Sequence, residues 1–257
     1  MHKRNNREPR EQRDNDEIIY GRNAVSEAIK AGVSINKILY YAEATGSIVP
    51  IIKAAKDAKI ILAAADRNKL NEIAGTKDHQ GIVAYVSPKE YVTIDDILKI
   101  AEDKGEPPFI IIMDEVQDPH NLGAVLRTCD AVGAHGVVIS KRRGAPLTGT
   151  VAKASAGALE HVPVARATNI TATIKELKDK GLWIYGTDMD GETNFFDADL
   201  KGPVALVIGS EGFGMGRLVK ENCDFILNIP MQGKVSSLNA SVAAGVVMYE
   251  IFRQRRK

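Results

Sequence analysis

Polar and glycine-rich segments follow three of the short apolar runs in this sequence, and they hold residues that could bind a ligand or assist a reaction. They are residues 114–123, 209–216 and 230–239, and the second places the carboxylate Glu211 among four glycines. In parallel sheets, ligands bind in the loops beyond the carboxyl ends of the strands. We therefore expect the chemistry of this protein to lie in these segments.

The glycines of segment 209–216 do not form a dinucleotide-binding fingerprint. The pattern G-x-G-x-x-G needs a third glycine five residues after the first, and Gly212 and Gly214 are followed there by Arg217. A Walker-type phosphate loop is also absent from the sequence. A NAD-dependent oxidoreductase is therefore disfavoured, whereas glycine at this density indicates a tight turn that admits a ligand close to the backbone.

Arg127 has two readings that the sequence leaves open. The helix predicted over 121–133 has an apolar face, and Arg127 points nearly opposite to it. A solvated surface arginine is the ordinary reading. Its neighbours Ala124 and Ala131 are small, however, so another surface could also approach the guanidinium.

Three other polar residues of these segments could simply cap helices. Asn121 is read as the N-cap of the helix over 121–133, and Ser237 and Asn239 are candidate caps of a last helix over 239–254. Small residues in that last helix indicate close packing against another helix, and a dimer interface is one place where such packing could occur. They are Ala240, Ala243, Ala244 and Gly245.

The pattern of apolar runs divides the chain into two α/β regions. Residues 18–90 alternate short helical and extended patterns, which predicts a small α/β domain. Residues 91–107 are typical of a linker, with a short helix expected over 93–101. Over 108–257, continuous apolar strands alternate with helices, which predicts a parallel sheet covered on both faces. The highly charged residues 1–17 are expected to form a disordered arm.

Composition indicates a soluble globular protein of one or two domains. The 257 residues are 44% hydrophobic and 26% charged, with a net charge of +1. No apolar run approaches the ~20 residues of a membrane span, and the N-terminus lacks the apolar core of a secretory signal. Cys129 and Cys223 lie in apolar segments without the spacing of metal ligands, so we expect reduced core cysteines, no metal and a cytoplasmic location.

Two clusters of basic residues could bind phosphate groups. One is Lys141, Arg142 and Arg143, and the other is Arg253 together with residues 255–257. Clusters of this size are more often solvated surface, so these alone do not identify a nucleic-acid-binding protein.

The three segments resemble, in order and spacing, the three motifs of the SpoU branch of the SPOUT RNA methyltransferases. The matching runs are Asn121-Leu-Gly-Ala-Val-Leu-Arg127-Thr, Leu206-Val-Ile-Gly-Ser-Glu211-Gly-Phe-Gly-Met-Gly and Ile229-Pro-Met-Gln-Gly-Lys-Val-Ser-Ser-Leu-Asn239-Ala-Ser-Val-Ala. The N-terminal region resembles the substrate-binding domain of the family, which is similar to a small RNA-binding ribosomal-protein fold. That likeness is carried by Tyr20-Gly21-Arg22-Asn23-Ala24-Val25 and Gln80-Gly81-Ile82.

The resemblance implies S-adenosylmethionine as methyl donor, bound in a deep trefoil knot formed by the last third of the chain. It also implies a homodimer with the pocket near the subunit interface. The residues that match donor-binding positions are Gly209, Ile229 and Leu238 through their backbone, Met231 as part of the pocket wall, and Ser237 near donor or substrate. Arg127 matches the catalytic arginine, Glu211 and Asn239 its supporting polar groups, and Asn121 an ordering residue.

The implied reaction is methyl transfer to a ribose 2′-hydroxyl of RNA, and the layout most resembles the enzymes that modify a guanosine of 23S rRNA. A tRNA enzyme of the same family is the nearest alternative, followed by a non-catalytic RNA-binding or ribosome-assembly protein. The role of Arg127 stays open between a base and a group that stabilises developing negative charge, although a guanidinium is a poor base. Glu211 would then orient Arg127 or accept the proton.

Overall fold

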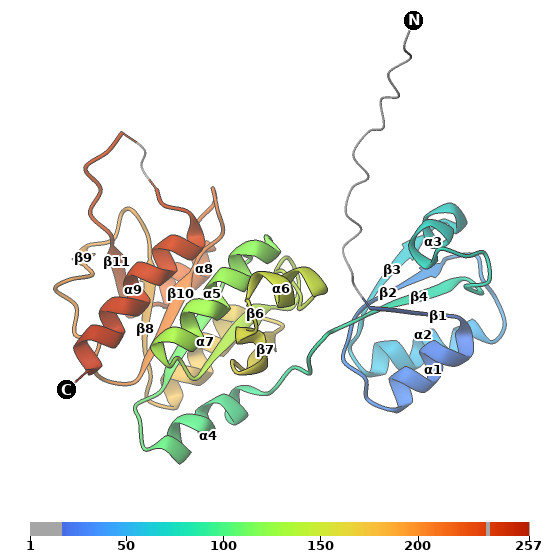
Figure 1. Ribbon diagram of the computed structural model, residues 1–257, viewed down its shortest axis with the longest axis horizontal. Helices are drawn as coiled ribbons and strands as arrows, with labels where there is room; N and C mark the ends of the chain where they lie inside the picture. Colours follow the sequence, from blue (N-terminus) through green and yellow to red (C-terminus); the bar gives the residue numbers. More distant parts are fainter. Residues whose placement is uncertain (1–16, 235–236, 257) are drawn as a thin grey trace, which may run out of the picture.

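The computed structural model describes residues 17–234 and 237–256, and within them the chain forms a four-stranded and a seven-stranded sheet (Figure 1). The predicted arm over 1–17 lies outside the described residues except for Glu17. The N-terminal unit holds the smaller sheet and three helices, and the C-terminal unit holds the larger sheet and the remaining helices. The predicted α/β class and parallel sheet are confirmed.

The N-terminal unit has the strand order β1-β4-β2-β3, in which β1 and β2 run antiparallel to β4 and β3 runs parallel to β2. The strands are β1 (Ile18–Tyr20), β2 (Ile35–Tyr41), β3 (Ile61–Ala65) and β4 (Ile82–Val86). The helices are α1 (Arg22–Lys30), α2 (Ile48–Asp57) and α3 (Arg67–Ala74). Apolar residues of α1 and α2 pack on one face of the sheet, and α3 packs on the other with Leu70 fully buried.

The C-terminal unit has the strand order β7-β6-β5-β10-β8-β11-β9, and all strand pairs in it among the described residues are parallel. The strands are β5 (Phe109–Met113), β6 (Gly136–Ser140), β7 (Val164–Ala167), β8 (Trp183–Thr187), β9 (Thr193–Asn194), β10 (Val204–Ile208) and β11 (Phe225–Asn228). The helices are α4 (Ile94–Lys104), α5 (Pro119–Val132), α6 (Gly149–Ala154), the 3₁₀ helix η1 (Ala158–Glu160), α7 (Ile170–Asp179), α8 (Arg217–Asn222) and α9 (Ala240–Arg255).

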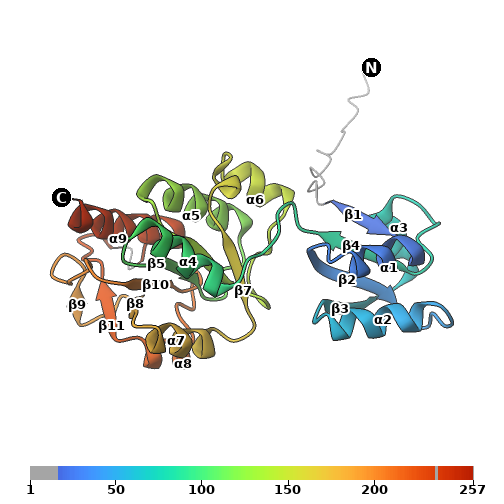
Figure 2. The same cartoon turned by 90° about the horizontal axis from the view of Figure 1, so that it is seen from below.

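Helices cover both faces of the larger sheet because its central strands are apolar on both sides. Phe109, Ile111 and Met113 of β5 face one hydrophobic core, whereas Ile110 and Ile112 face the other. Successive side chains of a strand point to opposite faces, so this strand serves both cores. Figure 2 shows α5, α6 and α9 on one side of the sheet and α7 and α8 on the other.

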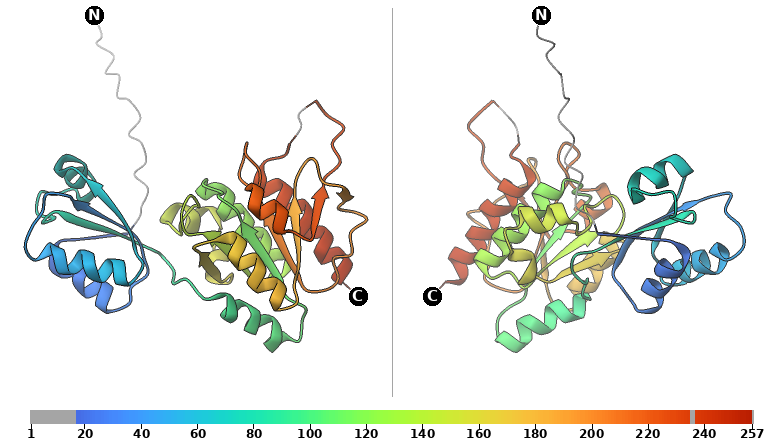
Figure 3. Two further views of the ribbon diagram at one scale, coloured as in Figure 1. Left: turned by 180° about the vertical axis from the view of Figure 1, so that it is seen from behind. Right: turned by 45° about the vertical axis from the view of Figure 1, so that its right-hand side comes forward.

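Helix α4 belongs to the packing of the C-terminal unit, although residues 91–107 are predicted as a linker with a short helix. The side chain of Thr93 and that of Asp96 form a capping box at its start. Ile97 is fully buried in the second core, against Gly136, where an added Cβ would lie 2.7 Å from the Ile97 side chain. The single covalent connection to the N-terminal unit is visible in Figure 3.

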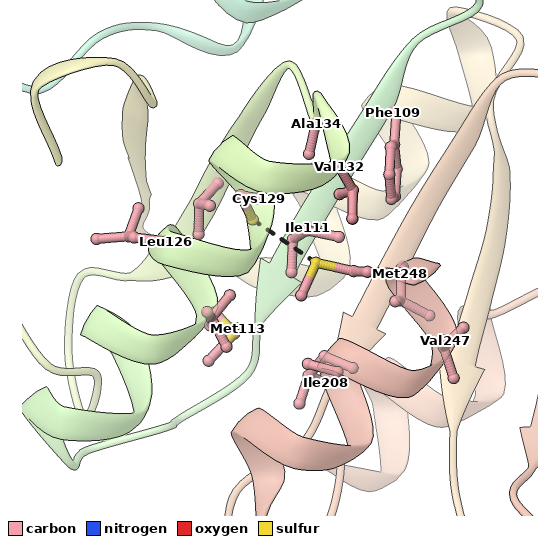
Figure 4. Close-up of a cluster of buried hydrophobic side chains, with 14 of the residues drawn as sticks. Phe109, Ile111, Met113, Leu126, Cys129, Val132, Ala134, Ile208, Val247 and Met248 are labelled. Carbon is pink, nitrogen blue, oxygen red and sulfur yellow. Dashed lines mark hydrogen bonds between the residues drawn. The ribbon is translucent and has the colours of Figure 1, made fainter. Parts of the chain in front are cut away.

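The core between α5 and α9 contains one of the two cysteines (Figure 4). Cys129 is fully buried, its Sγ lies 3.7 Å from the Sδ of Met248, and burial raises the pKa of its thiol. Cys223 is half-buried, and burial raises the pKa of its thiol to about 12. Both cysteines are free thiols, and both lie among apolar residues, as the sequence predicts.

Small residues of α9 pack within the chain. Ala240 and Ala244 are buried in the core, and Gly245 faces Thr128 of α5. The exposed apolar residues of α9 are Val242, Val246 and Tyr249. None of the helices in the described part of the chain has the length and apolar character that a bilayer crossing requires.

Candidate active site

A cavity of about 1040 Å³ opens at the carboxyl edge of the larger sheet, where β8, β10 and β11 end. Its lining includes seven of the predicted site residues: Gly209, Glu211, Ile229, Met231, Ser237, Leu238 and Asn239. Ligand pockets for small molecules commonly have volumes of ~300–1000 Å³. The second and third polar segments therefore meet at one hollow of suitable size.

The loop after β10 is closed by its own backbone. Ser210 and Gly214 exchange two N–H···O bonds of 2.9 Å. Gly209 must lack a side chain, because an added Cβ would lie 2.2 Å from the carbonyl carbon of Gly214. Gly212 and Gly214 have φ of +86° and +66°, a region that favours glycine. The loop thus presents its backbone to the cavity and its Phe213 ring, 94% exposed, to solvent.

Asp114 anchors the end of that loop to the neighbouring strand. It follows β5, is 4% exposed, and its Oδ2 accepts the N–H of Gly216 at 2.8 Å. Burial raises the pKa of this carboxyl, against the opposing effect of the Gly216 bond. Asp114 lies in the first polar segment, 114–123, but its residue type and position alone predict no role for it.

Asn121, Glu211 and Asn239 form a hydrogen-bonded triad from three distant parts of the chain. Asn121 Nδ2 donates to Glu211 Oε1 at 2.8 Å, and Asn239 Nδ2 donates to the same oxygen at 2.5 Å. Asn239 Nδ2 also donates to Asn121 Oδ1 at 3.0 Å. Glu211 and Asn239, which match supporting polar groups of the family, are therefore in direct contact with Asn121, which matches an ordering residue.

The prediction that Asn121 caps a helix is wrong, and the cap is Asp118. The side chain of Asp118 accepts the N–H of His120 at 2.8 Å, and Pro119 occupies the first helical position. Helix α5 therefore begins earlier than predicted, and Asn121 lies inside its first turn, 4% exposed, with its amide free for Glu211. Asn239 does cap α9, since its Oδ1 accepts the N–H groups of Ser241 and Val242.

Arg127 lies on the exposed face of α5, as its helical position predicts, but outside the cavity lining. No hydrogen bond or ion pair joins it to any described residue. The structure therefore places Glu211 and Asn239 at the cavity, joins Asn121 to them by hydrogen bonds, and leaves Arg127 apart from all three.

The loop after β8 also lines the cavity and is absent from the predicted site residues. It contributes Asp188, Asp190 and Glu192, and Lys220 of α8 pairs with Asp188 at 3.0 Å. Its signal is present in the sequence, because residues 188–194, which are polar or glycine except for Met189, directly follow the strand β8. With Glu211, these carboxylates outnumber Lys220, the one lysine among the described residues that line the cavity, so the cavity favours a cationic ligand.

Among the described residues, no group of histidine, cysteine or acidic side chains could hold a metal ion. The cavity instead combines exposed backbone groups, carboxylates and the apolar side chains of Ile229, Met231 and Leu238. This mixture fits an organic ligand that has both a charged end and a flat apolar ring.

Two family models match this chain. Residues 108–249 match the SpoU rRNA Methylase family, and residues 18–92 match the RNA 2′-O ribose methyltransferase substrate-binding family. YacO of Bacillus subtilis (strain 168), which carries the name of a TrmH family tRNA/rRNA methyltransferase, is 53% identical over 241 residues, which are 93% of this chain and 96% of that protein.

Solved structures share the fold. The SpoU methyltransferase AviRb from Streptomyces viridochromogenes, in complex with the cofactor AdoMet, has a TM-score of 0.59 and 26% identity, covering 93% of this chain and 90% of that chain. The TrmH/SpoU tRNA modifying enzyme of A. aeolicus has a TM-score of 0.53 and 30% identity, covering 63% of this chain and 83% of that chain. On the extent of the family match and the identity to YacO, this chain belongs to the SpoU family of RNA methyltransferases.

Proposed function

We propose that this protein transfers a methyl group from S-adenosylmethionine to a ribose 2′-hydroxyl of RNA, and that its target is a guanosine of 23S rRNA. The observation that carries the proposal is the triad in which Glu211 and Asn239 line a cavity sized for a nucleoside-like ligand and Asn121 hydrogen-bonds to both of them. The match of residues 18–92 to a substrate-binding family of RNA 2′-O ribose methyltransferases supports the choice of the 2′-hydroxyl.

The cavity fits the proposed donor. Gly209 lines the cavity and is available to the donor, and Ile229, Met231 and Leu238 offer apolar contact for an adenine ring. Ser237 lies at the same wall and is available to donor or substrate. The surplus of carboxylates suits a ligand that carries a sulfonium and an ammonium group. When bound, the donor supplies an electrophilic methyl group, so the protein needs only to position the hydroxyl and help its proton leave.

Glu211 is preorganised for that task. The amides of Asn121 and Asn239 hold Oε1, and Oε2 has no bond to another described residue. Oε2 can therefore accept a third donor, either the guanidinium of Arg127 or the ribose hydroxyl. In our proposal Arg127 stabilises negative charge that develops on the attacking oxygen and contacts a neighbouring phosphate.

Because Arg127 lies outside the cavity lining, RNA or a second protomer must complete the reacting site. Exposed Val242, Val246 and Tyr249 on α9, which packs on α5, support a homodimer. The trefoil knot and the cytoplasmic location stay predictions. Sedimentation of the purified protein would test the dimer.

Transfer of labelled methyl from S-adenosylmethionine to protein-free 23S rRNA and, separately, to bulk tRNA tests the proposed activity. The RNA is digested and its 2′-O-methyl nucleosides are identified. Label in a guanosine of 23S rRNA supports the full proposal. Label in tRNA alone would support the proposed reaction but show that tRNA, and not 23S rRNA, is the substrate. The likeness to the A. aeolicus tRNA modifying enzyme supports this alternative. Label in neither RNA, with donor bound, favours a non-catalytic RNA-binding or assembly protein.

Arg127→Ala is expected to abolish methyl transfer and to leave the donor Kd within about twofold, because Arg127 contacts neither the cavity nor the triad. Calorimetric titration with the donor and single-turnover methylation measure the two effects. Arg217→Ala is the matched control, since Arg217 is an exposed arginine that pairs with Glu221 on α8. A large loss of donor affinity in Arg127→Ala would make Arg127 a structural residue.

A further inference from the structure

A buried set of hydrogen bonds joins the two units of the chain. Asn36 of β2, 6% exposed, donates through Nδ2 to the carbonyl of Leu147 at 2.7 Å. The hydroxyl of Tyr91 donates to Asn36 Oδ1 and accepts the N–H of Leu147, both at 2.8 Å. These three residues, which we name the seam, hold β2 of the N-terminal unit against the segment before α6.

Positively charged side chains gather beside the seam. Lys141, which follows β6, donates through Nζ to the carbonyl of Lys59 in the turn between α2 and β3, at 2.5 Å. Burial, followed by the charges of Arg166, Lys59 and Arg142, holds the pKa of Lys141 below its ordinary value. Arg166 lies over the ring of Tyr91, 3.9 Å from its centroid. Cations of both units therefore stand close enough to repel one another.

These cations have no carboxylate partner among the described residues. Neither Lys59, Lys141, Arg142 nor Arg166 forms an ion pair there, whereas the adjacent Arg143 pairs with Glu115 at 3.2 Å. Like charges held together without counter-charge raise the free energy of the folded protein. A polyanion that bridges the two units would remove that cost, and RNA is the polyanion that this family modifies.

The cations also face the same edge of the sheet as the cavity. Lys141 directly follows the carboxyl end of β6, and only β5 separates β6 from β10, whose loop lines the cavity. Neighbouring strands are ~4.8 Å apart, so the ends of β6 and β10 are about 10 Å apart. An RNA strand whose target ribose enters the cavity can therefore continue along this edge to the seam.

We propose that Lys59, Lys141, Arg142 and Arg166 form one phosphate-binding surface for RNA across the seam. One RNA segment is then held by both units while its target nucleotide enters the cavity. This inference rests on the proposed RNA substrate. It identifies the residues that bind the phosphate groups of the RNA backbone. It predicts that RNA binding, unlike donor binding, depends on these cations.

The test is the salt dependence of RNA binding by the full-length protein. Each phosphate contact contributes about 0.7 to 0.9 to the slope of log K against log salt. The double variant Lys141→Gln/Arg142→Gln should lower the slope by about 1 to 2 and weaken binding to protein-free 23S rRNA or bulk tRNA at least about tenfold. The donor Kd should stay the same, because both residues lie outside the cavity lining.

Two further variants keep the result interpretable. Arg142→Gln alone breaks no described bond, so its expected slope change of about 0.7 to 0.9 cannot come from loosening the seam. Lys99→Gln/Lys175→Gln removes the same charge from exposed positions on α4 and α7 and should leave the slope unchanged.

Slopes and affinities equal to those of this control would overturn the inference. The binding assay needs no methyl donor, so a wild-type protein that methylates neither RNA would count against the proposed function while the binding result still decides the role of the seam.

Discussion

Two asparagine amides donate to one oxygen of Glu211. The hydrogen bonds of this side chain can therefore be tested separately from its negative charge. Asn121 and Asn239 donate to Oε1 at 2.8 and 2.5 Å. A glutamine at this position still offers one acceptor oxygen to both amides but has no negative charge. The contribution of the charge to methyl transfer can therefore be measured with little change in packing.

Glu211→Gln is expected to lower kcat at least about tenfold and to shift the melting temperature by only a few degrees, since hydrogen bonds to a charged acceptor are worth ~1.5–3 kcal/mol and those to a neutral one somewhat less. Methylation kinetics and thermal melting measure the two quantities. Glu221→Gln, which removes an exposed carboxylate from α8, should change neither. An unaltered kcat in Glu211→Gln would show that the hydrogen-bonded shape suffices and the charge is dispensable.

Single residues also show where capping rules fail. Asn121 is a good N-cap residue, but Asp118 followed by Pro119 is better placed, since aspartate caps and proline favours the first helical position. The helix therefore starts before Asn121 and leaves its amide for Glu211. The resemblance to SpoU motifs marks Asn121 as an ordering residue of the site. Local propensity alone could not do so, because its partners Glu211 and Asn239 are 90 and 118 residues away along the chain.

At the scale of elements, a buried histidine links the first residues of two neighbouring strands by a hydrogen bond. His135 directly precedes β6, its Nδ1 accepts the N–H of Phe109 at the start of β5 at 3.0 Å, and its Nε2 lies 3.1 Å from Glu106. Since Nδ1 accepts a backbone N–H, the proton of the neutral ring is on Nε2 and faces Glu106. Burial lowers the pKa of His135, against the raising effect of Glu106.

The sign of the resulting pH dependence follows from that lowered pKa. Below ~6.5 the unfolded chain binds a proton at this histidine that the folded chain resists, so stability falls as the pH decreases. The loss is at most ~1.4 kcal/mol per pH unit for one proton. Urea denaturation between about pH 7.5 and pH 5 should give a steeper decline for the wild type than for His135→Gln. His161→Gln, at an exposed position, should follow the wild type, and equal slopes in all three proteins would refute the assignment.

The elements themselves were largely predictable, but the order of the strands was not. Continuous apolar runs such as Phe109–Met113 and Val204–Ile208 predict buried parallel strands, and both are central. Sequence order does not reveal that β8 inserts between β10 and β11. That insertion brings Asp188 and Glu192 into the cavity. The loop after β8 is therefore absent from the predicted site, because its contact with the cavity depends on the strand order. The two-residue strand β9 has no periodicity to detect.

At the scale of the whole molecule, our proposal requires two separate sheets to present one RNA to one cavity. The connection between them is a single chain segment (Figure 3), so their relative placement depends on side-chain contacts. Asn36, Tyr91 and Leu147 supply these contacts in a buried position. Asn36 is separated from Leu147 by 111 residues, and neither periodicity nor motif singles it out.

Tyr91→Phe tests whether the seam fixes this placement. The substitution removes the hydroxyl, which leaves Asn36 Oδ1 and the N–H of Leu147 without their partner, while the ring stays under Arg166. A buried polar group without a partner costs ~1–3 kcal/mol. We therefore expect the free energy that protects the Leu147 amide from hydrogen exchange to fall by about this amount, and the KM for RNA to rise with the donor Kd unchanged.

Asn36→Ala and the double variant complete a cycle that isolates the seam from effects on either unit alone. Residues that share one hydrogen-bond network couple by ~0.5–3 kcal/mol, whereas independent sites add. Because both substitutions remove the same bond between Tyr91 and Asn36, the loss of protection in the double variant should be smaller than the sum of the two single losses. Strict additivity, or a Leu147 amide that exchanges as fast in the wild type as in Tyr91→Phe, would mean that the two units move independently and that RNA itself brings them together.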